Sequence, residues 1–451
     1  MITSPVKSLF ILLLLGTAAP LLAQHPVLDR YVQEGLSNNL GLKQEQLAFE
    51  GTKAAVESAK RLNYPTIALQ GSYTLATGGR AIDLPIGDLL NPVYATLNEM
   101  TQSNQFPMLE NVREQLSPNN FADVKVRTTV PIINPDIRIG RSVEQEKAAM
   151  QSLQIRRTER DLTYQIKAAY FNYLQAGEAI KIYESALGLL KENLRVNQSL
   201  LKNEKINKAP VVRVEAEISK VNAQMVEAET RQHNAAAYFN TLLRRPLDAP
   251  IEVAQLPSAD SLLQMSALMQ LTEVQRREEV QQIDKAITLS QLSLESQQNF
   301  NKPRLNAFLD LGAQGFLANI DGRAPYALGG LQLEWTLWNG NRNRYQEQQV
   351  EFQSQQLQVR RQDVVNQFRL RQKVAAEEVR SAYESLKSTT QEVASANEYF
   401  RVVDRSYRED MATYIEYLDA RTQLTNSRLQ LNLKAYQLWA QMAALERELV
   451  F

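Results

Sequence analysis

Two long stretches without helix-breaking residues constrain this chain most. Residues 341–451 contain neither glycine nor proline, and residues 141–209 contain no proline and only Gly177 and Gly188. An average globular helix has about 11–12 residues, so these stretches predict unusually long helices. Apolar side chains recur there at alternating steps of four and three, the heptad pattern of a left-handed coiled coil. In the first stretch they include Leu162, Ile166, Ala169, Tyr173, Ala176 and Ile180. We therefore expect a mixed, mainly α chain with long antiparallel coiled-coil helices.

Each long stretch is expected to turn back on itself. Residues 207–210 (Asn-Lys-Ala-Pro) interrupt the first pattern, and Val211, Val214 and Ile218 resume it. The second pattern breaks near residues 409–413 and resumes at Leu418. We predict two helical hairpins, with tips at about 205–211 and about 408–415.

Four shorter segments alternate between apolar and polar residues, at about 65–75, 122–133, 303–314 and 326–338. Alternation over about ten residues suits a transmembrane barrel strand, but a half-buried soluble sheet has the same pattern. Four strands cannot close a barrel, because about eight is the practical minimum. If these strands lie in a membrane, several chains must share the barrel. Three aromatic residues would then suit its interfacial girdle, namely Tyr73, Tyr326 and Trp335.

The chain contains two copies of one plan. Residues 63–65 (Asn-Tyr-Pro) resemble residues 301–303 (Asn-Lys-Pro), and residues 153–157 resemble residues 357–361. Copy one carries an insertion between these landmarks, in the Gly-, Pro- and Asn-rich stretch from about residue 76 to 121, which has no period. The expected divisions are a first repeat at 24–245, a proline-rich inter-repeat segment at 246–270 and a second repeat at 271–451.

The first residues resemble a secretory signal. Lys7 precedes the apolar run 9–15, and small residues lead to a plausible cleavage after Ala23. A buried N-terminal helix is the alternative. With residues 1–23 removed as a signal peptide, the remaining chain would work outside the cytoplasm.

Composition excludes several kinds of function. The chain has no cysteine, only His25 and His233, and 50 basic against 50 acidic side chains. Thiol nucleophiles, Cys/His zinc sites and disulfides are therefore excluded, and no basic field exists to concentrate nucleic acid. No Gly-rich phosphate loop, nucleophile elbow or metal-ligand cluster occurs. We expect no enzyme activity, no cofactor and no metal.

With these features together, the sequence resembles the TolC-like family of outer-membrane efflux proteins. Residues 413–421 (Thr-Tyr-Ile-Glu-Tyr-Leu-Asp-Ala-Arg) are similar to the family's second hairpin tip, and residues 337–340 (Leu-Trp-Asn-Gly) to the exit from its last strand. The resemblance implies a homotrimer in the outer membrane of a Gram-negative bacterium, with a shared 12-stranded β-barrel. It also implies a hollow α-barrel of helices extending into the periplasm. The implied partners are outer-membrane lipid, a periplasmic adaptor (membrane fusion protein) and an inner-membrane transporter of the RND or ABC type.

The resemblance also implies a periplasmic aperture at the second hairpin tip. Its two acidic positions match Glu416 and Asp419, and a preceding tyrosine matches Tyr407. Spacing of three residues puts both carboxylates on one helix face, although a solvated acidic face has the same pattern. This sequence departs from the family in Asp410 and Ala412, which replace a glycine and an arginine, and in Val212, which replaces an acid. The tip residues expected to contact an adaptor are Lys208, Ala209, Pro210, Val211, Asp410, Met411, Ala412 and Thr413.

Two functions remain open from the sequence. The first is a passive exit duct for a tripartite efflux or type I secretion system. The second is a periplasmic coiled-coil adaptor or scaffold of an export system. A need for detergent to extract the mature protein from membranes would favour the first.

Overall fold

The computed structural model describes residues 26–116, 119–254, 258–268, 273–316, 324–409 and 411–449. The predicted signal at 1–23, His25 and Asp410 lie outside these ranges. The chain forms two compact units. Unit 1 contains residues 1–52, 147–287 and 355–451, and unit 2 contains residues 53–146 and 288–354. Each unit therefore takes segments from both predicted repeats.

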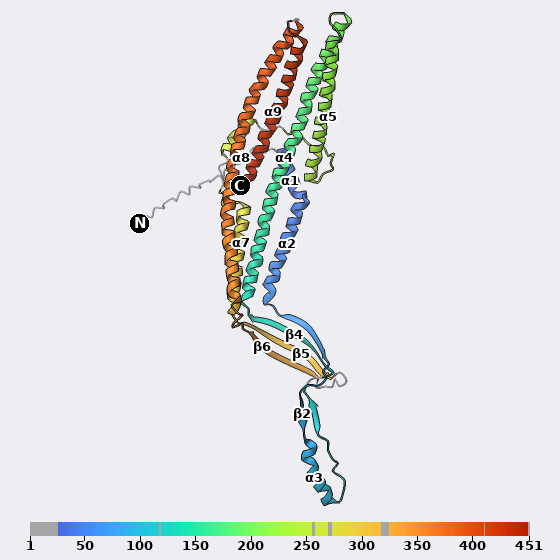
Figure 1. Ribbon diagram of the computed structural model, residues 1–451, viewed down its shortest axis with the longest axis vertical. Coiled ribbons are helices and arrows are strands. Elements are labelled where there is room, and N and C mark those ends of the chain that lie inside the picture. The colour runs from blue at the N-terminus through green and yellow to red at the C-terminus, as the bar shows by residue number, and fades with distance from the viewer. Residues whose placement is uncertain are drawn as a thin grey trace, which may run out of the picture. The chain divides into compact units, whose positions relative to one another are not determined.

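The order of elements occurs twice along the chain (Figure 1). The first series is α2 (Leu40–Lys60), η1 (Arg61–Asn63), β1 (Thr66–Thr74), β4 (Phe121–Ile133), α4 (Pro135–Lys202) and α5 (Ala209–Leu243). The second series is α7 (Glu278–Gln298), η3 (Asn299–Asn301), β5 (Arg304–Phe316), β6 (Pro325–Glu334), α8 (Arg342–Arg408) and α9 (Tyr414–Glu448). Corresponding helices match in length: α2 and α7 have 21 residues each, and α5 and α9 have 35 each.

The sequence around residue 135 explains where the long helix α4 begins. Helix α4 has 68 residues, roughly 100 Å at 1.5 Å per residue. It begins at Pro135, before the glycine-poor stretch, because the Asn134 side chain accepts a hydrogen bond from the Asp136 amide. Proline at the first helical position is compatible with such a start, since its missing N–H would have no partner there. Within the described ranges, none of the helices combines the length and apolar character that crossing a membrane requires.

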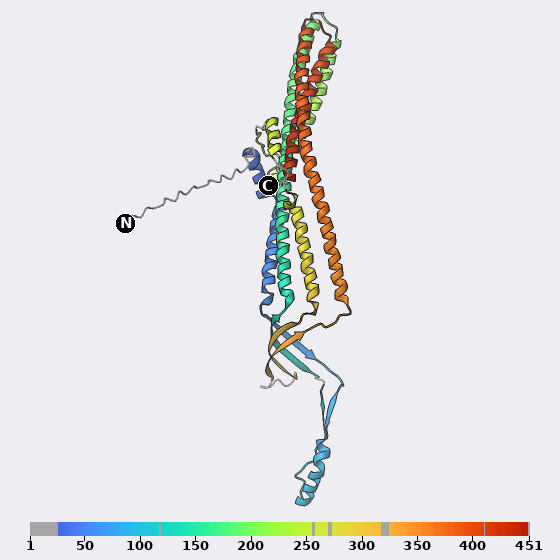
Figure 2. The same cartoon turned by 90° about the vertical axis from the view of Figure 1, so that its left-hand side faces the viewer.

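Both hairpin turns are short. The first occupies residues 203–208, where Glu204 has a left-handed backbone (φ 56°) and the Asn207 side chain accepts from the Ala209 amide at 2.9 Å. The second lies between the end of α8 at Arg408 and the start of α9 at Tyr414. Figure 1 shows α4 beside α5 and α8 beside α9 near these turns, and in Figure 2 the four helices overlap at this end. The four helices share a core there, formed by Ala186, Leu187, Leu190, Val214, Val221, Val403, Tyr417, Leu418 and Ala420.

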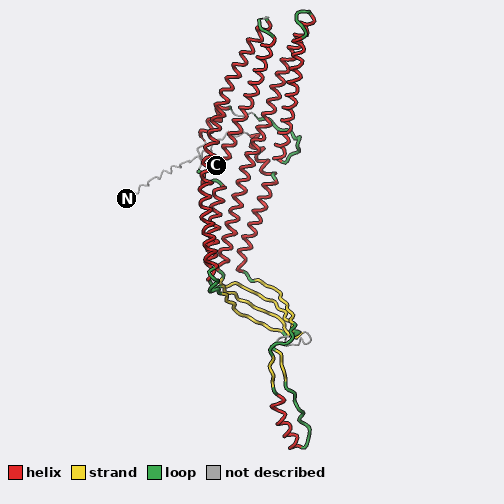
Figure 3. The backbone as a smooth tube through the Cα atoms, in the orientation of Figure 1, coloured by secondary structure: helices red, strands yellow, loops and turns green. Residues whose placement is uncertain are grey.

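Four antiparallel strands of unit 2 form a sheet in the order β1-β4-β5-β6. Strands β1 and β6 are its edges. The strands coincide with the four alternating segments, except that β6 ends at Glu334 and not near residue 338. Glu334 pairs with Arg304, the first residue of β5, so the following residues have no strand to pair with. Figure 3 shows the four strands side by side.

The insertion in the first repeat has a helix and two strands of its own, although its sequence has no period. It contains β2 (Ala81–Leu84), α3 (Ile86–Thr101) and β3 (Val112–Gln115), with β2 and β3 paired antiparallel. We call residues 76–120 the appendage. It connects the end of β1 to the start of β4.

The termini of the described chain pack within unit 1. Helix α1 (Pro26–Asn38) contacts α5, with the Tyr31 ring 5.1 Å from the Phe239 ring. In the proline-rich inter-repeat segment, α6 (Ala259–Leu268) contacts α9 and buries Leu262. These contacts cover the middle of the long helices with apolar side chains.

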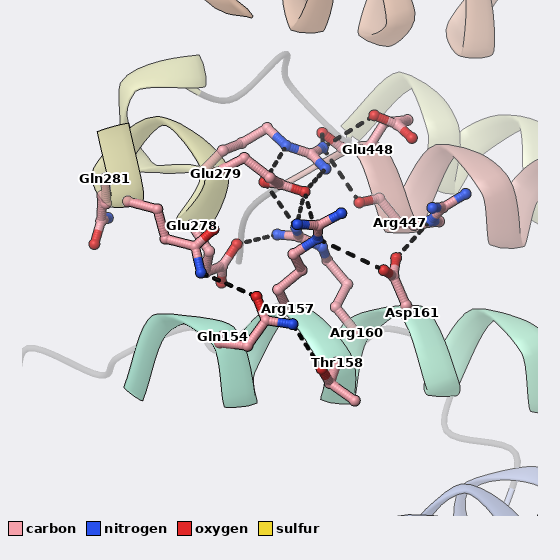
Figure 4. Close-up of polar contacts among 12 residues, drawn as sticks. Gln154, Arg157, Thr158, Arg160, Asp161, Glu278, Glu279, Gln281, Arg447 and Glu448 are labelled. Carbon is pink, nitrogen blue, oxygen red and sulfur yellow. Dashed lines mark hydrogen bonds and ion pairs between the residues drawn. The ribbon is translucent and has the colours of Figure 1, made fainter. Parts of the chain in front are cut away.

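An ion network joins α4, the start of α7 and the end of α9 (Figure 4). Arg277 is its centre, only 2% exposed, with its guanidinium 4.0 Å from the Phe368 ring centroid. Its Nη1 donates to the Glu448 carbonyl at 2.6 Å and to the Glu448 carboxylate at 3.0 Å. Arg160 contacts both Glu278 and Glu279. Burial alone raises the pKa of Glu279, but hydrogen bonds and charge from Arg277, with the charge of Arg160, lower it overall.

We expect Arg277→Met to destabilise unit 1 strongly, because Glu279 and Glu448 would keep their buried charge without this partner. Breaking a buried ion pair costs about 3–5 kcal/mol. The matched control is Arg276→Met, since Arg276 is exposed and its ion pair with Glu273 is worth about 0–1 kcal/mol. The midpoint of thermal unfolding, followed by circular dichroism, should fall for Arg277→Met and stay for Arg276→Met. Equal midpoints for the two variants would contradict the central role of Arg277.

Candidate functional site

The second hairpin turn holds the predicted aperture residue Glu416 in a capping box. Thr413 is the N-cap of α9, and its Oγ1 accepts from the Glu416 amide. In return, the Glu416 carboxylate accepts from the Thr413 amide at 2.6 Å and from its hydroxyl at 2.9 Å. Those two hydrogen bonds, the backbone one first, lower the pKa of Glu416. Glu416 therefore starts α9 and also presents a carboxylate that stays ionised to lower pH than an ordinary glutamate.

Asp419 lies one helical turn after Glu416, and both side chains are exposed. Positions three apart share a helix face, so the two carboxylates form one acidic strip on α9. Tyr417, which lies between them in the sequence, is buried and does not interrupt the strip. The arrangement repels anions and attracts cations at the turn.

The predicted aperture residue Tyr407 does not stand free at the turn. It stacks on Tyr417 at 5.1 Å between ring centroids and lies 5.9 Å from the Tyr414 ring. Its hydroxyl donates to the Asn197 side chain of α4 at 3.2 Å. Asn197 is fully buried and donates in turn to the Asn193 carbonyl at 3.0 Å. Tyr407 thus links the two hairpins.

Arg421 is a residue of this region to which the sequence assigned no role. It is 2% exposed, and its Nη2 lies 3.6 Å from the Glu217 carboxylate of α5. Burial lowers the pKa of Arg421, and burial chiefly raises the pKa of Tyr417 to about 12. Among the described residues, Nε and Nη1 of Arg421 and the Tyr414 hydroxyl are buried without a hydrogen-bond partner. Its position four residues after Tyr417 and three before Leu424, on the apolar seam, was the available signal.

The turn residues differ in what they present. Lys208, Ala209, Met411 and Thr413 are exposed, and Pro210 and Ala412 are half-buried. Val211, which the sequence placed among the adaptor-contacting residues, is only 6% exposed, because it begins the apolar seam of α5. Val212 is its exposed neighbour. Asp410 lies outside the described residues.

The sheet of unit 2 has one apolar and one charged face. The apolar face is largely exposed and includes Ile67, Leu69, Tyr73, Val124, Val126, Leu309, Leu311, Leu331 and Leu333. On the other face, Arg127 donates to both oxygens of Asp310 at 2.7 and 2.6 Å. Lys125 contacts Asp123 at 2.9 Å and Asp310 at 3.8 Å. The charged side chains therefore form ion pairs with one another on a single face of the sheet.

The three predicted girdle residues lie in different surroundings. Tyr73 is on the apolar face, and its hydroxyl donates to Asn120 at 2.6 Å. Tyr326 pairs in register with Gly312 beside Lys125, and its hydroxyl donates to Asp123 at 2.8 Å. It therefore points to the charged face, and its assignment to a lipid-facing girdle is corrected. Trp335 follows β6, is exposed, and donates from Nε1 to the Asn301 carbonyl.

The described ranges hold no group of three or more His, Asp or Glu side chains placed to bind a metal ion. The acidic strip at the turn is open to solvent. Residues 268–449 match the outer membrane efflux protein family. This confirms the resemblance found in the sequence, and members of that family are outer-membrane proteins.

Solved structures show the same fold. The outer-membrane channel OprN superposes with a TM-score of 0.73 at 14% identity, covering 94% of this chain and 89% of that one. The outer membrane protein VceC of Vibrio cholerae gives 0.71 at 14% identity, covering 93% and 94%. The MtrE outer membrane channel of Neisseria gonorrhoeae, solved in its open state, gives 0.71 at 13%, covering 94% and 88%. No curated protein sequence matches the chain.

We expect Arg421→Met and Glu217→Gln to have opposite effects on stability. Methionine would remove a buried, incompletely bonded charge, and Glu217 would keep Arg213 at 3.6 Å. Replacing such a charge by an apolar side chain is often neutral or stabilising. Glu217→Gln would instead leave Arg421 buried without its ion-pair partner.

The thermal midpoint should therefore stay or rise for Arg421→Met and fall for Glu217→Gln. A fall of similar size for both variants would show that Arg421 has a strong partner in the assembled protein.

Proposed function

We propose that this chain is the outer-membrane exit duct of a tripartite efflux or type I secretion system. It works as a homotrimer whose four strands per chain form one 12-stranded barrel. The observation that carries the proposal is the sheet: its apolar face is exposed over most of its area, and its edges β1 and β6 lack neighbours within the sheet. Lipid would cover the apolar face, and strands of sister chains would pair with the two edges.

The strand count is compatible with closure by three chains. A bilayer offers no water to backbone N–H and C=O groups, so every strand edge inside it must be paired. Antiparallel pairing of β6 with β1 of the next chain closes a ring without any new element. Three chains of four strands exceed the minimum of about eight that a barrel needs. The charged face with Arg127 and Asp310 then lines the lumen.

The helices form the rest of the duct. Helices α4, α5, α8 and α9 have polar outer positions and apolar seams, as helices in a coiled-coil wall require. We place this α-barrel in the periplasm, with the hairpin turns facing an adaptor. Of the tip residues expected to contact an adaptor, Lys208, Ala209, Met411 and Thr413 are exposed. Glu416 and Asp419 supply rings of negative charge at the aperture.

Transport through such a duct is passive and needs no catalytic residue. Energy comes from an inner-membrane transporter of the RND or ABC type, coupled through the periplasmic adaptor. A soluble adaptor or scaffold, the alternative, would leave Leu69, Leu331 and Leu333 of the sheet in water, which disfavours it.

We expect the double variant Glu416→Gln/Asp419→Asn to weaken cation selectivity. Glutamine at the third helical position keeps a capping box, so the charge changes without the turn. In a planar bilayer with a KCl gradient, the reversal potential should move toward zero. The control Glu57→Gln/Glu178→Gln removes as many charges away from the turn. An unmoved reversal potential would remove these two carboxylates from the aperture, and failure of the wild type to conduct would end the duct proposal.

The capping box also predicts a pH effect. In the Asp419→Asn background, cation selectivity depends on the charge of Glu416. Because the pKa of Glu416 is lowered, its carboxylate stays charged at pH values where an ordinary glutamate is already protonated. Selectivity is then lost only as pH falls below the ordinary glutamate range of about 4.3. Thr413→Ala removes one of the two hydrogen bonds, so the pH midpoint of selectivity should rise. A midpoint that does not change would show that this hydrogen bond is not maintained in the open channel.

A further inference from the structure

One face of α3 is covered by another segment of the appendage, which two asparagine side chains hold by hydrogen bonds. The Asn91 side chain accepts from the Leu109 amide at 2.7 Å and donates to the Leu109 carbonyl at 2.8 Å. Asn98 makes the same pair of bonds with Phe106, at 3.0 and 2.7 Å. The two asparagines are seven residues apart and share a helix face. They hold segment 104–111 along α3, because each asparagine side chain bonds to both the N–H and the C=O of one residue of that segment.

Further contacts hold the same segment against this face of α3. The Asn111 side chain accepts from the Asp88 amide and donates to the Asp88 carboxylate at 2.8 Å. Gly87 lets the segment approach, because a Cβ there would come within 2.3 Å of the Leu109 carbonyl oxygen. The appendage is therefore a fixed small fold, and α3 cannot turn its other face inward.

That other face is apolar and exposed. Leu89, Val93 and Met100 are 69%, 51% and 78% exposed. Their spacing of four and seven residues puts them in one stripe, on the side of α3 opposite Asn91 and Asn98. Thr96, also exposed, lies on the same face between Val93 and Met100. An exposed, mainly apolar stripe on a surface helix is typical of an interaction site.

Topology places the appendage beside a subunit boundary of the proposed barrel. The appendage leaves the sheet where β1 ends and β4 begins, at the end of the strands away from η1 and α4. Strand β1 is an edge, so its outer neighbour would be β6 of another chain. Figure 1 shows β2 and α3 continuing from that end of the strands. Three appendages would thus stand around one mouth.

We infer that the α3 stripe binds the same stripe of the two sister chains on the threefold axis, so that three appendages form a collar above the extracellular mouth. This rests on the proposed trimeric duct. Charge disfavours a lipid surface as the occupant: α3 contains Asp88 and Glu99 but no basic residue, and anionic lipid phosphates would find no counter-charge. Sister stripes need little intrinsic affinity, because the trimer holds them at an effective concentration in the millimolar range.

A cysteine cross-link tests the collar, since the chain contains no cysteine. In Val93→Cys, mild oxidation of the detergent-solubilised protein should join two of the three chains in most trimers, seen as dimers on a non-reducing gel. The control is Ala95→Cys, which is exposed on the same helix but about 160° around it from Val93 at 100° per residue. We expect several-fold less dimer there.

A second variant keeps the test independent of disulfide geometry. Adding Leu89→Gln and Met100→Gln to Val93→Cys should reduce the dimer several-fold while the particle stays trimeric. Trimers in which Val93→Cys cross-links no better than Ala95→Cys would overturn the collar. If the thiol of Val93→Cys does not cross-link but is shielded from a water-soluble maleimide only in liposomes, the collar would be overturned in favour of lipid. A particle that is not a trimer would refute the duct itself, which separates the two failures.

Discussion

The unpaired edges of the four-stranded sheet are the constraint on which the rest depends. Strands β1 and β6 each present a row of backbone N–H and C=O groups without a neighbouring strand in the sheet, and the apolar face beside them is exposed. Water could satisfy the edges but not the apolar face, and lipid could cover the face but not the edges. The closed sheet in a bilayer that we propose satisfies both. The duplicated order of elements is consistent with this, because each repeat adds one pair of strands and one helical hairpin.

Periodicity made much of this fold predictable. Steps of four and three marked α4, α5, α8 and α9, and strict alternation marked the four strands within a few residues at most of their ends. Tertiary context decided the remainder. Strand β6 stops at Glu334 because β5 begins at its partner, Arg304, which no pattern in β6 reveals. Tyr326 was assigned to the wrong face because an aromatic residue was expected at an interface, whereas its register with Gly312 places it beside Lys125 and Asp123.

Side-chain hydrogen bonds to the backbone escaped the sequence analysis. The sequence analysis found no period in the appendage and missed Asn91 and Asn98, which hold it together, each through both polar atoms of its amide. At the hairpin turn, Glu416 was read as a charge and is also the partner of Thr413 in a capping box. Arg421 was read as part of a motif and is a buried cation between two helices. In each case a polar residue makes a contact that stabilises the fold. A residue pattern alone does not distinguish such a residue from one that only faces water.

The most direct test of the account is the protein mass of the detergent-solubilised particle, determined by light scattering during size-exclusion chromatography with the detergent contribution subtracted. Chains that close one another's sheet predict a single species of three polypeptides, each slightly below 51.2 kDa if the signal is removed, that requires detergent to stay in solution. A stable, folded single chain in detergent-free buffer would contradict it, because its strand edges and apolar face would then need no sister chains.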